Sequence, residues 1–67
     1  MELTQAVGET AGQVWQELNH HGPQTLSKLK KKINGSGPVV ELAVGWLARE
    51  DKISITRVKK SLEVRLK

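Results

Sequence analysis

The 67-residue sequence contains no cysteine, phenylalanine or tyrosine, and only two histidines. Without cysteine there are no disulfides, and two histidines fall short of the roughly four Cys or His ligands of a structural zinc site. No apolar run approaches the roughly 18 residues of a membrane span, and the N-terminus lacks a basic segment followed by an apolar one. We therefore expect a soluble cytoplasmic protein that does not associate with membranes.

Residues for catalysis are also scarce. The histidines, His20 and His21, adjoin each other, so the chain lacks a triad-like set of side chains, and no phosphate-binding loop or metal motif appears. Adjacent helical residues point about 100° apart and chelate one ion poorly, so both histidines are interpreted as favouring the end of a helix through its dipole. Glu50 and Asp51 are assigned to a turn, facing solvent. We expect no enzymatic activity, no cofactor, no metal and no small-molecule substrate.

The length favours a single domain that spans residues 1–67. A chain this short buries only about 60% of the surface that its unfolded form exposes, which leaves its stability marginal. Hydrophobic residues make up 37% of the sequence, enough for a core of aliphatic residues, Trp15 and Trp46. Because disulfides and zinc are excluded, self-association is the remaining common way to stabilise such a domain.

Positive charge is confined to the later part of the chain. Residues 1–24 contain three glutamates but no lysine or arginine, although the formal net charge is +4. This basicity permits contact with nucleic acid without requiring it. The basic residues form two clusters, which are Lys28, Lys30, Lys31 and Lys32, and then Arg57, Lys59 and Lys60.

The spacing of apolar residues predicts three helices. Spacings of three and four residues from Leu3 to Leu18 indicate an amphipathic helix, with Thr4 as its N-cap and HHGP at 20–23 as its end. Glycine weakens a helix by up to about 1 kcal/mol relative to alanine, so the two glycines inside this one either permit close packing or are tolerated. They are Gly8 and Gly12.

A second, two-turn helix should follow a very short strand at Thr25 and Leu26. Ser27 is its expected N-cap, and Leu29 and Ile33 are its inward residues. NGSG at 34–37 breaks the chain. The third helix should then run from Pro38 to about Glu50, with Ser36 available as its cap.

Beyond Asp51 the apolar period changes to two, which predicts two strands. Ile53 and Ile55 lie in the first strand, and Leu62, Val64 and Leu66 lie in the second. RVKKS at 57–61 lacks the Asn-Gly or Gly-Gly of a tight two-residue hairpin, so we expect a longer basic loop. The order helix, short strand, helix, helix, strand, loop, strand is that of the α+β winged helix-turn-helix, in which the third helix reads the major groove and the loop forms the wing.

Two blocks, AGQVWQEL at 11–18 and LAVGWLAREDKI at 42–53, resemble a family of small, stand-alone winged helix-turn-helix proteins of unknown function in bacteria and archaea. Each block places a tryptophan in a fixed small-residue context, and the resemblance spans nearly the whole chain. The resemblance implies a winged-helix fold, a dimer and a nucleic-acid role by analogy. It carries over no catalytic or base-reading residue.

The third helix is unusually apolar for a base-reading helix, since its apolar arc covers roughly 240° against the 100° or so that one-sided packing requires. Val40, Val44 and Leu47 should face the core, which leaves Leu42 and Trp46 on the outer side. Base edges favour Arg, Lys, Asn or Gln, and Arg49 is the only such residue on that side. Direct base reading by this helix is the least favoured possibility, and two others remain open for the outer apolar residues. They tuck into the core beneath helix one or the sheet, or they anchor a dimer interface made of Val39, Leu42 and Trp46.

The basic clusters also allow two interpretations. Several lysines close together can neutralise phosphates without reading sequence, or can form a solvated face that keeps a small domain soluble. The preferred interpretation is a homodimer that grips the backbone of double-stranded DNA in transcription regulation, and the alternative is a protein-interaction module that keeps the fold without binding DNA. The expected DNA-contacting residues are Lys28, Lys31, Lys32, Arg49, Arg57, Lys59 and Lys60.

Overall fold

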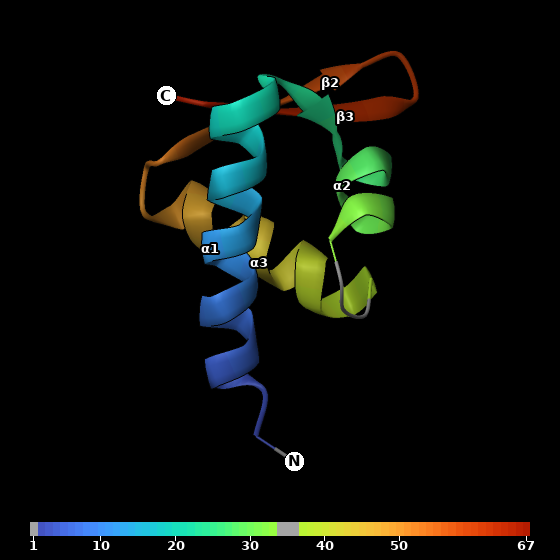
Figure 1. The fold of residues 1–67 in the computed structure, drawn as a ribbon. Coiled ribbons are helices and arrows are strands. Elements are labelled where there is room, and N and C mark those ends of the chain that lie inside the picture. Colours follow the sequence, from blue (N-terminus) through green and yellow to red (C-terminus); the bar gives the residue numbers. More distant parts are fainter. Residues whose placement is uncertain (1, 34–36) are drawn as a thin grey trace.

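The computed structural model describes residues 2–33 and 37–67, which form three helices and a three-stranded antiparallel sheet (Figure 1). The predicted α+β winged-helix order is confirmed. The expected cap at Ser36 lies outside the described residues. The elements are α1 (Thr4–His21), β1 (Gln24–Thr25), α2 (Leu26–Lys32), α3 (Gly37–Arg49), β2 (Ile53–Val58) and β3 (Ser61–Leu66).

Helix α1 begins without a side-chain cap. Its N-cap residue is Leu3, and Thr4 is the first helical residue, so the predicted cap at Thr4 is wrong. The Thr4 hydroxyl instead donates a hydrogen bond to the Glu2 carboxylate. The predicted end is confirmed, because Gly22 adopts φ 79° and its N–H donates to the Leu18 carbonyl at 2.9 Å. A positive φ of this kind is readily reached by glycine.

Helix α2 is capped by Thr25 and not by Ser27, so that prediction is also wrong. The Thr25 hydroxyl oxygen accepts a hydrogen bond from the Lys28 N–H at 3.2 Å. Thr25 has the extended backbone that an N-cap requires, because it is also the last residue of β1, whereas Ser27 already lies inside the helix.

Strand β3 lies in the middle of the sheet, in the order β1-β3-β2. Val64 pairs with Gln24 on one side and with Ile55 on the other. Val58 pairs with Ser61, so only two residues join β2 to β3, and the longer loop that the sequence predicts is wrong. The tight turn is possible because Lys59 adopts φ 57°, in the left-handed region that glycine or asparagine usually occupies.

The core lies where all three helices meet the sheet. Its largest fully buried side chains come from four different elements, and they are Val14, Leu29, Val40 and Val64. The predicted inward residues of α2 and α3 are confirmed as buried. Figure 1 shows that α1 ends beside the sheet, while its first turns extend away from it. Within residues 2–33 and 37–67, no helix has the length and apolar character needed to cross a membrane.

Candidate nucleic-acid interface and exposed apolar face

The tip of the β2–β3 hairpin carries three exposed cations. Lys59 and Lys60 form the turn itself, and Arg57 lies on β2, two residues before Lys59. Within the described part of the chain, none of the three pairs with a carboxylate. Their full charge therefore faces solvent at one end of the hairpin.

The lysines of α2 divide into two kinds. Lys30 lies 3.2 Å from the Glu41 carboxylate, and Lys32 lies 3.1 Å from the Glu17 carboxylate. Lys28 and Lys31 are exposed and form no ion pair among the described residues. The structure therefore leaves about half of the predicted lysine cluster available to an external anion.

The ion pair with Lys32 also changes the acidity of its partner. The hydrogen bond from Lys32 holds the pKa of the Glu17 carboxyl below its ordinary value of 4.5, although desolvation of the carboxyl opposes this effect. Glu17 also accepts a hydrogen bond from the Gln24 side-chain amide at 3.5 Å. One carboxylate thus ties α1 both to α2 and to the start of the sheet.

The fold brings the hairpin tip and α2 together but not Arg49. Helix α2 packs against β3, and Figure 1 shows α2 and the hairpin tip on the same side of the molecule. Arg49 ends α3 at the point from which β2 departs toward the tip. The six residues of β2 span roughly 20 Å, so Arg49 lies far from Lys59 and Lys60.

The outer face of α3 exposes the apolar residues in question. The exposed fractions of the Leu42 and Trp46 side chains are 53% and 47%, so the alternative that both belong to the core is wrong. Val39 is half-buried. Among the described residues of this face, Arg49 is the one arginine, lysine, asparagine or glutamine that can hydrogen-bond with base edges, so the face is poorly suited to direct readout in the major groove.

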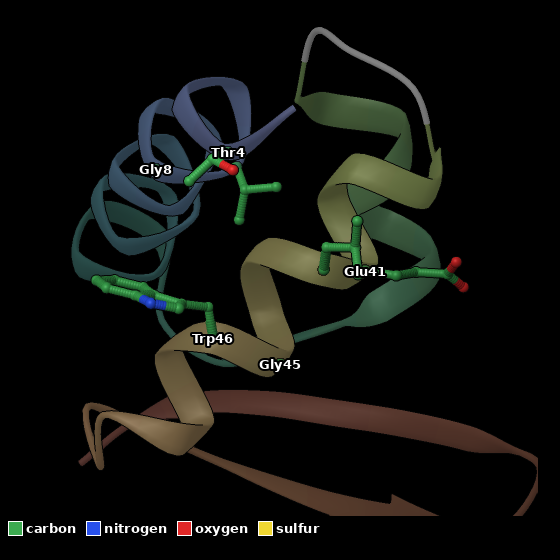
Figure 2. Close-up of a pocket in the computed structure, with 7 residues that line it drawn as sticks. Thr4, Gly8, Glu41, Gly45 and Trp46 are labelled. Carbon is green, nitrogen blue, oxygen red and sulfur yellow. The ribbon is translucent and has the colours of Figure 1, made fainter. Parts of the chain in front are cut away.

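A furrow runs along the seam between α1 and α3, and its first hollow is shown in Figure 2. This hollow has a volume of about 690 Å³, and Trp46 extends from α3 toward α1 at one end of it. The Glu41 carboxylate points away from α1. The hollow is lined by Thr4, Val7, Gly8, Glu41, Leu42, Gly45 and Trp46.

A second hollow, of about 300 Å³, continues the furrow on the other side of Trp46. Trp46 and Gly8 line both hollows, and Gly12 and Trp15 line the second. Sequence reasoning missed the part of this face that α1 supplies. The sequence signal for this part of the face was the pair of glycines four residues apart within one helix, because residues at that spacing share a helix face.

The histidines carry no sign of a metal site. His20 and His21 lie exposed in the last turn of α1, with ring centroids 6.4 Å apart. Across residues 2–33 and 37–67, no group of three or more His, Cys, Asp or Glu side chains is placed to hold a metal ion.

Comparison with known proteins places this geometry in a family. The sequence profile described as "Winged helix-turn-helix domain (DUF2582)" matches residues 1–66. The chain belongs to the DUF2582 family. Within it, α3 occupies the position of the recognition helix and the β2–β3 hairpin that of the wing. The resemblance carried by the two tryptophan blocks is confirmed.

Relatives of this DUF2582 chain come from an archaeon and a bacterium. The chain is 39% identical over 64 residues to the uncharacterized protein MJ1608 of Methanocaldococcus jannaschii, an alignment that covers 91% of this chain and 90% of the relative. It is similar to the solution NMR structure of protein BT2368 from Bacteroides thetaiotaomicron, with a TM-score of 0.83 and 38% identity, over 97% of this chain and 79% of that chain.

Proposed function

We propose that the protein binds the backbone of double-stranded DNA through its wing and helix α2, as a non-enzymatic domain. The observation that carries this function is the unpaired cluster of Arg57, Lys59 and Lys60 at the hairpin tip. Lysine and arginine side chains at such a tip neutralise phosphates and fix orientation without reading sequence. Helix α2 lies on the same side of the molecule as the hairpin tip, and its exposed Lys28 and Lys31 extend the charge available to phosphates.

Helix α3 has a different role in this proposal. Its outer face presents Leu42 and Trp46 where a base-reading helix would carry polar side chains. Apolar side chains with depleted charge are typical of the centre of a protein interface. The binding unit is therefore a homodimer, with Val39, Leu42 and Trp46 in its interface. Arg49 remains the single candidate for contact with a base edge, and Lys32 joins the phosphate contacts only if it leaves Glu17.

The test is a fluorescence-anisotropy titration of a mixed-sequence duplex at several salt concentrations. Five unpaired cations in contact with phosphates would lower the affinity roughly 500-fold between about 50 and 200 mM salt. The double variant Lys59→Ala with Lys60→Ala should weaken binding equally on every sequence and reduce the salt slope by about two. The loss of affinity in this variant should exceed the loss caused by removing two cations elsewhere on the protein, which changes only the net charge.

A matched variant removes the same formal charge at another place. Arg65→Ala with Lys67→Ala deletes two cations that already pair with Glu63 and Asp51. This variant should change the salt slope by less than about half of the change that the loss of one phosphate contact produces. Equal loss in the two double variants would contradict a role for the wing. Affinity that does not respond to salt, or no binding at low salt, would favour the second candidate, a protein-interaction module that uses Leu42 and Trp46.

A further inference from the structure

The apolar face of this protein is larger than the outer side of α3. Trp15 on α1 is 38% exposed, and with Leu42 and Trp46 on α3 it makes up three of the six large hydrophobic side chains that the described residues expose. Trp15 and Trp46 line the same hollow of the furrow. The interface candidate therefore includes α1 as well as α3.

The furrow has both a projection and a depression, which a self-complementary surface needs. Trp46 stands as a ridge between the two hollows, because it lines both of them. In a two-fold interface the same patch of each copy must supply both the projection and the depression that receives it. A furrow with a tryptophan ridge beside a hollow of about 690 Å³ meets this condition.

The glycines of α1 keep the furrow open. Apart from the chain neighbours and the backbone of α1 itself, no atom lies within 4 Å of the position that a Cβ would take at Gly8 or Gly12, so close packing against another element of this chain does not explain either residue. Each glycine weakens the helix by up to about 1 kcal/mol relative to alanine. Bare backbone facing open space is what lets another molecule approach a helix closely.

The surface area and the charge distribution both favour a second copy as the occupant. The protein exposes 4770 Å², whereas a folded monomer of 7.4 kDa is expected to expose about 4200 Å². Among the residues that the structure describes, Lys52 is the only cation that lines the furrow, and the clusters of the wing and of α2 do not line it. Two chains of net charge +4 can therefore meet along this face without bringing those clusters together.

We infer that two copies pair furrow to furrow about a two-fold axis, with Trp46 of each copy seated in the first hollow of the other, between Val7 and Leu42. This inference rests on the homodimer of the proposed function, but not on DNA binding. It adds α1 to the interface and buries the outer face of α3 against protein. DNA then meets the wings and α2, and Arg49, which does not line the furrow, remains the candidate for contact with a base edge.

The first experiment is sedimentation equilibrium of the full chain over a range of concentrations. Wild type should be a dimer, and Gly8→Arg should dissociate at least about tenfold more readily because the new side chain fills the first hollow. Arginine is a far better helix former than glycine, and its Cβ at this position meets no atom beyond the backbone of its own helix, so the variant should fold, which circular dichroism checks. Gln13→Arg introduces the same side chain on an exposed part of α1 outside the furrow, and its dimer should match wild type.

The second experiment is an isotope-filtered NOE measurement on a sample that mixes labelled and unlabelled wild type. Contacts between the Trp46 indole of one copy and the Val7 and Leu42 methyls of the other are expected. A dimer that persists in Gly8→Arg, or that lacks these contacts, would overturn the furrow interface and leave the homodimer standing. A wild type that stays monomeric up to about 1 mM would overturn both. Whether the furrow interface or the whole homodimer is overturned, the salt titration of Gly8→Arg with duplex measures DNA binding independently of dimerisation.

Discussion

Lys32 Nζ lies 3.1 Å from Glu17 Oε1, so a single ion pair joins the second helix to the first. Because Lys32 lowers the pKa of Glu17 in the folded state, the ionised carboxylate stabilises the fold at pH values above its ordinary pKa of 4.5. That contribution disappears as the pH falls through the lowered folded-state pKa. Both side chains are partly exposed, so the effect is small and is reduced by salt.

The first prediction concerns this pH dependence. Lys32→Gln should lower the free energy of unfolding relative to wild type at about pH 6, and the difference should be smaller at about pH 3, because the contribution is lost as the pH falls through the lowered pKa of Glu17. Urea denaturation at the two pH values measures it. Lys31→Gln removes the same charge from α2 without breaking an ion pair, and it should show no such pH dependence. A Lys32→Gln deficit of the same size at both pH values would contradict the assignment.

The cap of α2 supplies the second prediction. Thr25→Ala removes the oxygen that accepts the Lys28 N–H and should cost about 1 kcal/mol of unfolding free energy. Ser27→Ala changes a hydroxyl two residues later that does not cap the helix, and it should change stability by less than about 0.5 kcal/mol. Chemical denaturation of the two variants decides the matter. The reverse order of effects would restore Ser27 as the cap.

The third prediction concerns the wing turn. Lys59 holds φ 57°, a conformation that costs an ordinary L-residue about 1 kcal/mol or more and that asparagine tolerates better. Lys59→Asn should therefore stabilise the fold by about 0.5 kcal/mol. Lys60→Asn removes the same charge at a residue without positive φ and should not stabilise it. Thermal unfolding compares the pair, and equal midpoints would contradict the strain at Lys59.

The periods of the apolar residues predicted the order of the elements, because a spacing of three and four residues indicates a helix and a spacing of two indicates a strand. Val14, Val40 and Val64 each belong to the regularly spaced apolar residues of their own helix or strand, and all three are fully buried. The ends of elements were predicted less well. Threonine and serine are both favourable N-cap residues, and the choice between Thr25 and Ser27 depends on where β1 ends, which its pairing with β3 determines. In the same way the pairing of Val58 with Ser61 imposes a tight turn on two lysines.

The candidate site was predictable in composition but not in arrangement. The two lysine clusters are plain in the sequence, yet the ion pairs Lys30–Glu41 and Lys32–Glu17 join different helices, so no spacing rule along one helix anticipates them. The separation of Arg49 from the wing depends on the direction in which β2 leaves α3. The exposure of Trp46 follows from how α1 crosses α3, since nothing in a helical plot distinguishes an outer core residue from an exposed one.

The central place of β3 determines when a nascent chain can finish folding. Neither β1 nor β2 has a strand partner until residues 61–66 have been synthesised, and the pairing of Gln24 with Val64 joins segments that are far apart in the sequence. Before that point the helices can form and begin to pack, because their contacts do not need the sheet. A chain that lacks residues 61–66 therefore leaves β1 and β2 as unpaired edges.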